Sequence, residues 1–138
     1  MAGLEEAIAL AVSAHRGQKD KAGQPYILHP LRMMLAVEGE HARMAAVLHD
    51  VVEDTEVSLE QLQAEGFPAE VVEAVDGLTR RADESYDEFI ERAAVNPIAR
   101  VVKKADLEDN MDLRRLAELG PKELERLARY RRVWERLA

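Results

Sequence analysis

The residues best able to do chemistry stand in one short run, His49-Asp50-Val51-Val52-Glu53-Asp54. On a continuous helix its four polar members would share one face, with His49 and Glu53, and likewise Asp50 and Asp54, one turn apart. Three crowded carboxylates with no Lys or Arg between them repel one another unless a cation neutralises them. The run is therefore either a solvated helix face or part of a metal site.

Two residues elsewhere could add ligands to such a site. His29 precedes Pro30, which suits the first turn of a helix expected from residue 31 to about residue 37. Tyr26 to His29 are expected to be largely extended, because a residue before proline avoids the α region. Asp106 shares one face of a later expected helix with Lys103 and Asn110. Taken singly, His29 is a capping or packing residue and Asp106 is a surface acid.

Asp109 does not fit the pattern of that later helix. It falls in line with Ile98, Val102 and Ala105, which form the apolar stripe expected to face the core. Either the stripe rotates at this point of the helix, or the acid points into a polar cavity.

The composition favours a helical protein held together by aliphatic side chains. Of the 138 residues, 47% are hydrophobic but only 4% are aromatic. Apolar residues recur at helical spacing between breaks at glycine and proline, and no segment alternates as a strand does. The length suits one domain. We therefore expect an all-α bundle of about seven or eight helices that forms a single domain over residues 1–138.

Charge and composition limit the ligands and partners. The chain has no cysteine, which excludes disulfides and thiolate metal sites, so nitrogen and oxygen atoms would hold any metal. The net charge of −8 argues against nucleic-acid binding, but a small anionic substrate could still bind in a cleft with local cations. No signal peptide or long apolar run is present. We therefore expect no membrane association and a cytoplasmic protein, either monomeric or a homo-oligomer.

Four blocks of sequence, in this order, resemble one known family. The first is residues 15–30, HRGQKDKAGQPYILHP, and the second is residues 48–55, LHDVVEDT. The third is residues 75–80, VDGLTR, and the fourth is residues 102–106, VKKAD, followed by Asn110-Met111. Together they resemble the HD superfamily of metal-dependent phosphohydrolases. Within it, they are most similar to the alarmone-hydrolase domain of the RelA/SpoT proteins and of their small stand-alone relatives.

The resemblance implies one divalent metal ion, usually manganese, held by His29, His49, Asp50 and Asp106. Two imidazoles and two carboxylates form an all-nitrogen-and-oxygen set that suits manganese. Glu53 and Asp54 would orient or deprotonate the attacking water. The implied substrate is guanosine tetraphosphate or pentaphosphate, from which water removes the 3′-diphosphate to leave GDP or GTP.

The same resemblance implies the substrate contacts. Asn110 would touch the nucleoside, and Lys103 would be a phosphate or structural contact. The family usually carries a basic residue that stacks on the base at the position of Asp20. The candidates to replace that cation are its neighbours in the loop, Arg16, Lys19 and Lys21.

Further departures concern the region after Asp106, where larger family members often have basic residues at the positions of Leu107 and Asp112. The departures put the substrate in doubt more than the reaction type. The same mechanism could act on another nucleotide, such as NADPH or a nucleoside phosphate. A catalytically idle regulatory module is a third interpretation, against which stands the presence of every expected metal-binding and water-activating residue.

Overall fold

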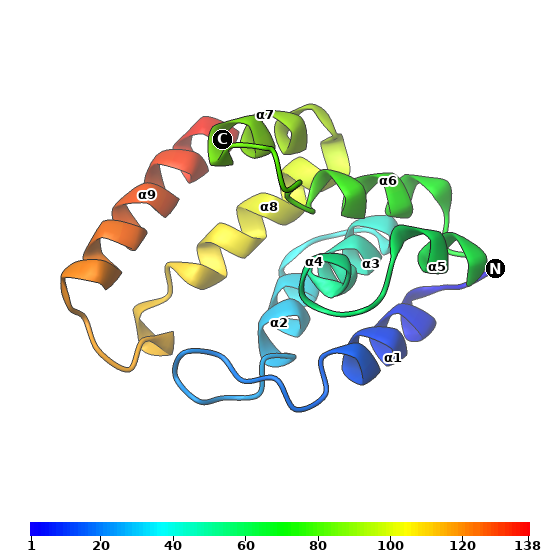
Figure 1. Ribbon diagram of the computed structural model, residues 1–138, viewed down its shortest axis with the longest axis horizontal. Helices are drawn as coiled ribbons and strands as arrows, with labels where there is room; N and C mark the ends of the chain where they lie inside the picture. The colour runs from blue at the N-terminus through cyan, green and yellow to red at the C-terminus, as the bar shows by residue number, and fades with distance from the viewer.

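The computed structural model describes residues 1–138 and is entirely helical, as expected (Figure 1). It has nine α-helices and one 3₁₀ helix, η1. Their bounds are α1 Leu4–Ala14, α2 Leu28–Ala36, α3 Glu40–Leu48, α4 Val51–Asp54, α5 Leu59–Ala64, α6 Ala69–Gly77, α7 Tyr86–Val95, α8 Pro97–Asn110, η1 Leu113–Arg115 and α9 Pro121–Leu137. The only strand-like pairing is an isolated bridge between Lys19 and Pro25. No helix combines the length and the apolar character that crossing a bilayer requires.

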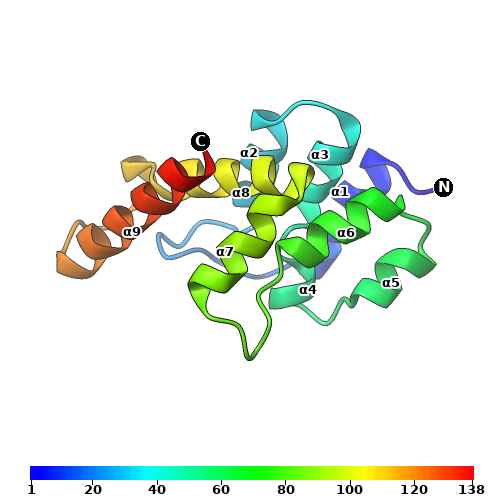
Figure 2. The same cartoon turned by 90° about the horizontal axis from the view of Figure 1, so that it is seen from above.

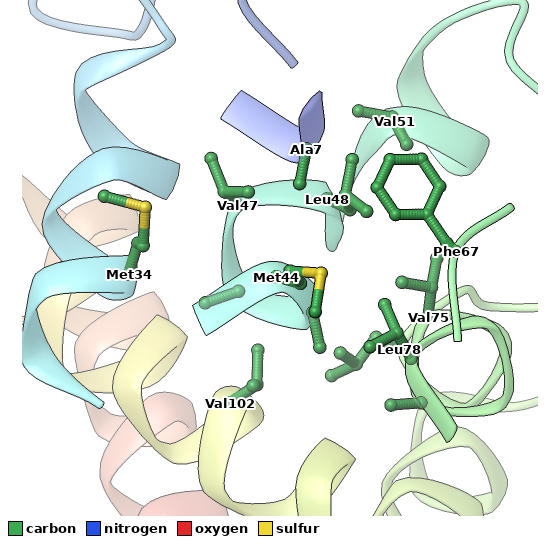
Figure 3. Packing of buried hydrophobic residues seen from close by; sticks show 14 of the residues in the cluster. Ala7, Met34, Met44, Val47, Leu48, Val51, Phe67, Val75, Leu78 and Val102 are labelled. Carbon is green, nitrogen blue, oxygen red and sulfur yellow. The ribbon is translucent and has the colours of Figure 1, made fainter. Parts of the chain in front are cut away.

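The main core surrounds α3, which packs against α1, α2, α6 and α8. Residues 44–48 of α3 are all buried, so this short helix is covered on every side at its C-terminal half. Figure 3 shows Met44 among side chains from neighbouring helices, including Val75 and Val102. Truncating a side chain buried to this degree costs ~2–5 kcal/mol, so the core fixes the C-terminal end of α3 firmly.

A second, smaller core joins α7, α8 and α9. It contains Phe89, Ile90, Ala94, Leu107, Val133 and Leu137. Helix α9 lies beside α7 and α8 on the side of the molecule away from α1 and α5 (Figure 2). Leu107, at a position where family members often carry a cation, is fully buried in this core. Helix α8 contributes to both cores and therefore connects them.

The helix expected through His49 to Asp54 is not continuous, and that expectation was wrong. Helix α3 ends at Leu48, a turn occupies His49 and Asp50, and α4 begins at Val51. The carbonyl of Ala46 accepts hydrogen bonds from both the backbone N–H of His49 and its ring Nδ1, in competition with the regular helical ladder. His49 is consequently buried instead of lying on a solvated face.

The expected start of α2 was also wrong. The helix begins at Leu28, so His29 already lies in its first turn instead of in an extended segment. Pro30 is tolerated there because the N–H groups of a first helical turn have no helical partner in any case. His29 and Pro30 are both buried, with the histidine held by a helix rather than by a loop.

Candidate active site

The four candidate metal ligands come together from three parts of the chain. His29 lies in the first turn of α2, His49 and Asp50 form the turn between α3 and α4, and Asp106 lies on α8. Asp106 Oδ1 is 2.9 Å from His29 Nε2 and 3.8 Å from His49 Nε2. Asp50 Oδ2 is 3.1 Å from His49 Nε2. The sequence-based choice of these residues is therefore consistent with their geometry.

The orientation of His49 suits metal binding. Its Nδ1 donates a hydrogen bond to the carbonyl of Ala46 at 2.8 Å. Its Nε2 is buried and has no hydrogen-bond partner. The nearby carboxylates favour a proton on this nitrogen, and a bound cation would take the place of that proton. The imidazole, protonated only at Nδ1, would then offer its Nε2 lone pair, which is the form in which histidine binds metals. One possible ligand atom each from His29, His49 and Asp50 lies within 4.8 Å of the others, so the residues fit a divalent cation.

Opposite charges stabilise the ionised form of the two aspartates. Burial alone would raise the pKa of Asp106, but Lys103 and the two histidines hold it well below its usual range. Lys103 Nζ donates to Asp106 Oδ2 at 2.9 Å. The pKa of Asp50 is likewise lowered by His49 against the effect of burial. Burial lowers the pKa of His49, but the Asp50 and Asp106 carboxylates outweigh this and raise it to about 9. Two anionic oxygen donors are therefore available in a buried site.

Glu53 and Asp54 lie on α4 at the open side of these ligands. Carboxylate oxygens of Asp50, Glu53 and Asp54 lie within 4.8 Å of one another. Glu53 accepts a hydrogen bond of 2.8 Å from the backbone N–H of Arg80. Burial raises the pKa of both Glu53 and Asp54. A carboxylate with a raised pKa, next to a metal site, is suited to accept a proton from water.

Arg92 holds the segment that orients Glu53. Its guanidinium donates to the backbone carbonyls of Asp76 at 2.8 Å and Thr79 at 2.7 Å. It also binds both carboxylate oxygens of Glu84, at 2.8 and 2.9 Å. These contacts join both ends of the loop between α6 and α7. Arg80, whose N–H binds Glu53, lies inside this loop, so Arg92 acts on Glu53 indirectly.

Two adjoining cavities contain the candidate site. The first, here called the metal cavity, has a volume of about 190 Å³ and is lined by Tyr26, His29, His49, Asp50, Glu53, Leu78, Phe89, Lys103, Asp106, Asn110 and Arg115. The second, here called the outer cavity, has a volume of about 180 Å³ and is lined by Asp20, Lys21, Tyr26, Asn110, Arg115, Leu116, Glu123, Arg126, Leu127 and Tyr130. Tyr26, Asn110 and Arg115 line both, so the two spaces meet at these side chains.

The predicted substrate-binding residues are only partly brought together. Lys103 and Asn110 line the metal cavity, and Lys21 lines the outer cavity. Arg16 and Lys19 are exposed and line neither cavity. The cations that the outer cavity has besides Lys21 are Arg115 and Arg126, which come from η1 and α9.

Asp20 has a structural role in the opening loop. Its Oδ1 accepts hydrogen bonds from the backbone N–H groups of Ala22 and Gln24, each at 2.9 Å. Gly23 between them has a φ of 84°, a left-handed conformation that glycine adopts without strain. The other carboxylate oxygen of Asp20 is 3.7 Å from Arg115. The acid thus closes the loop and leaves a negative charge in the wall of the outer cavity.

Three residues of the site were missed or left unexplained by the sequence. The Tyr26 hydroxyl donates a hydrogen bond to Asp50 Oδ2 and its ring packs on His15 and His29. Arg115 donates to Asn110 Oδ1 at 3.0 Å from a 3₁₀ turn that no helical periodicity could align with α8. Asp109 does point into a polar environment, where its Oδ2 lies 2.6 Å from His29 Nδ1. The place of this acid in the predicted apolar stripe was the one feature of the sequence that indicated an unusual role for it.

Comparison with known proteins gives one family. A family model described as an HD domain matches residues 7–119. A probable guanosine-3′,5′-bis(diphosphate) 3′-pyrophosphohydrolase of Synechocystis is 36% identical over 138 residues, which cover 89% of this chain and 18% of that protein. The Haemophilus influenzae guanosine-3′,5′-bis(diphosphate) 3′-pyrophosphohydrolase is 38% identical over 137 residues, which cover 87% of this chain and 20% of that protein. A Streptomyces coelicolor GTP pyrophosphokinase is 39% identical over 121 residues, which cover 78% of this chain and 14% of that protein.

The chain therefore spans about a fifth, or less, of the length of these curated relatives. A solved structure matches this chain over a much larger share of its own length. This structure, described as a metazoan ortholog of SpoT that hydrolyzes ppGpp and plays a role in starvation responses, matches with a TM-score of 0.79 at 27% identity. The match covers 97% of this chain and 84% of that one.

Proposed function

This chain belongs to the HD domain family, and we propose that it is a metal-dependent hydrolase of guanosine tetraphosphate and pentaphosphate. The reaction is hydrolysis of the bond between the 3′-oxygen and phosphorus, which yields GDP or GTP and pyrophosphate. The observation that supports it best is the convergence of two histidines and two ionised aspartates on a cavity, with Glu53 at its open side. Relatives named for this reaction support the substrate.

His29, His49, Asp50 and Asp106 would hold one divalent ion, for which we propose manganese. The all-nitrogen-and-oxygen donor set and the absence of cysteine fit this choice. When bound, the ion lowers the pKa of a water and neutralises charge that develops on the phosphate.

The chain's own side chains supply the remaining chemistry. Glu53, whose carboxylate is held by the N–H of Arg80, accepts the proton of the attacking water, and Asp54 orients that water. Lys103, half-buried beside Asp106, adds positive charge to the lining of the metal cavity. Asn110 stands where the two cavities meet, a position that suits contact with the nucleoside.

The outer cavity is the proposed site of the nucleoside and its 5′-phosphates. Its cations Lys21, Arg115 and Arg126 suit an anionic ligand, and the side chain of Tyr130 can stack against a base. Arg16 and Lys19 are proposed only as more distant, solvent-exposed cations. We further propose a small nucleotide in the cytoplasm, and no nucleic acid, as the physiological ligand.

A second candidate substrate follows from the two acids in the outer cavity. Asp20 and Glu123 lie in its wall beside the cations, which reduces its attraction for a highly charged tetraphosphate. A nucleotide with less charge at that end, such as NADPH or a simple nucleoside phosphate, would be cut by the same apparatus.

Turnover measurements separate these candidates. Purified protein with Mn²⁺ and guanosine tetraphosphate should release GDP and pyrophosphate, and chelation or His49→Ala should abolish the release. NADPH and nucleoside phosphates are assayed in parallel. Activity on one of these, with none on guanosine tetraphosphate, would favour the second candidate. No turnover of any nucleotide by the manganese-loaded protein would refute both.

A further inference from the structure

Asp109 is an acid placed where α8 should carry an apolar residue. It lies three residues after Asp106 on the same helix, and its side chain is only 11% exposed. Its carboxylate makes three side-chain contacts with other parts of the fold, to His29, Arg32 and Arg115. A half-buried acid with this many partners is held in one orientation.

The contact with His29 is on the side of the ring away from the metal cavity's ligands. His29 Nε2 faces Asp106 Oδ1 at 2.9 Å, while Nδ1 faces Asp109 Oδ2 at 2.6 Å. Because the two nitrogens point in different directions, Asp109 is placed to accept the Nδ1 proton rather than to bind the same cation. A neutral His29 protonated at Nδ1 would offer its Nε2 lone pair to a cation bound beside Asp106 Oδ1.

His29 and His49 are oriented by different means. His49 donates Nδ1–H to the neutral backbone carbonyl of Ala46. His29 donates to a carboxylate, which is the stronger acceptor and increases the electron density on the opposite ring nitrogen. The two histidines therefore receive unequal support. Asp109 is the only acceptor at His29 Nδ1, because Arg115 Nη1, which lies 3.4 Å from it, is a donor.

Two arginines hold Asp109 in position. Arg32 donates from Nε to Oδ1 at 2.8 Å and from Nη2 to Oδ2 at 3.1 Å. Arg115 Nη1 lies 2.9 Å from Oδ2 and also donates to the backbone carbonyl of Asp109. Arg32 comes from α2, the helix that carries His29, so the ion pair also links α2 to α8.

We propose that Asp109 is a positioning residue that fixes the ring orientation and the tautomer of His29 and thereby strengthens metal binding. The inference rests on the metal site of the proposed function and adds a residue outside the ligand set. Through Arg115, which also binds Asn110, the same carboxylate connects the metal cavity with the outer cavity.

The test is manganese affinity, measured on the full chain by titrating metal-free protein with Mn²⁺ and detecting free Mn²⁺ by electron paramagnetic resonance. Loss of a partner that orients a metal-binding histidine typically weakens binding ~10–100-fold, and this is expected for Asp109→Ala. Asp109→Asn keeps the size of the side chain and one oxygen acceptor, so it should lose less, about 3–10-fold.

Glu108→Gln is the matched control. Glu108 precedes Asp109 on α8, is exposed, and accepts a hydrogen bond from Trp134 that an amide oxygen can also accept. Its manganese affinity should equal that of the wild type. Thermal melts of all metal-free proteins show whether each variant folds, and Asp109→Asn serves if Asp109→Ala does not.

The outcomes are distinguishable. Weaker binding by a folded Asp109 variant, with Glu108→Gln unchanged, supports the inference. Wild-type affinity in a folded Asp109→Asn and Asp109→Ala would overturn it and leave the proposed function intact. If wild-type protein itself bound no manganese, the metal site of the proposed function would fail, and this inference with it.

Discussion

The metal cavity and the outer cavity share three side chains but are built differently. The metal cavity is lined mainly by side chains from α2, α4, α7 and α8 and from the turn after α3, and its residues His29, His49 and Asp106 are buried. Tyr26, Leu78 and Arg115 complete its lining. The outer cavity lies between the opening loop, η1 and α9, and its charged residues of opposite sign stand side by side. Several residues that line the metal cavity are therefore buried, whereas none of the residues that line the outer cavity is.

The difference follows from which core supports each cavity. The proposed ligands His49 and Asp50 directly follow α3, whose last residues are fully buried in the main core. The outer cavity depends on the first half of α9, where Leu124 is 54% exposed, while only the second half of this helix reaches the smaller core. The proposed reaction chemistry and the proposed substrate choice thus depend on parts of unequal packing, and substitutions in the two cavities should have unequal effects.

The largest expected effect comes from Asp50→Asn in the metal cavity. It preserves the shape of the side chain and an acceptor for the Tyr26 hydroxyl but removes one anionic donor. Loss of several kcal/mol of transition-state stabilisation corresponds to a fall of ~10³-fold or more in kcat. The measurement is nucleotide turnover at saturating Mn²⁺, with a melting curve to confirm folding. Retention of a tenth of the activity would remove Asp50 from the ligand set.

A substitution in the outer cavity should act on substrate binding instead. Arg126→Ala removes a charged donor, and such contacts contribute ~1.5–3 kcal/mol, so KM should rise ~10–100-fold with kcat changed little. Arg131→Ala is the control, since Arg131 lies on the exposed side of the same helix and pairs with Glu135. An equal rise in KM for both variants would show that α9 does not form a specific wall of the substrate site.

The indirect role of Arg92 gives a third, smaller effect on the metal cavity. Arg92→Lys cannot reproduce the fork that binds two carbonyls and the Glu84 carboxylate, so the loop with Arg80 should hold Glu53 less well. We expect kcat to fall about tenfold with KM unchanged, because only the base is misplaced. Steady-state kinetics on folded protein measure this split. A rise in KM alone would place the effect on the substrate instead.

The smallest effect is expected for Asp20→Asn, the same change of residue type as at Asp50. The amide oxygen can still accept the N–H groups that close the loop, while the negative charge near Arg115 disappears. Removal of one partly exposed charge is worth up to ~1 kcal/mol, so KM for guanosine tetraphosphate should fall by at most about fivefold. A raised KM would mean that Asp20 itself contacts the nucleotide.

The sequence by itself determined the helical class, the residue types of the proposed metal site and their order along the chain. Helical periodicity and glycine or proline breaks are local signals, and they located most of the helices. The blocks around His29, His49 and Asp106 indicated a metal-dependent phosphohydrolase without any knowledge of distances.

Only the tertiary structure decided how these residues meet. The turn at His49-Asp50 interrupts a pattern that periodicity treats as one helix, and it is what buries His49. Asp109 and His29 are 80 residues apart, so no local signal could pair them. Arg115 and Arg126, and not the loop residues Arg16 and Lys19, join Lys21 in the outer cavity, because α9 packs against α8. Contacts between residues that are far apart in the sequence depend on how the helices pack, and the pattern of residues along the chain does not specify that packing.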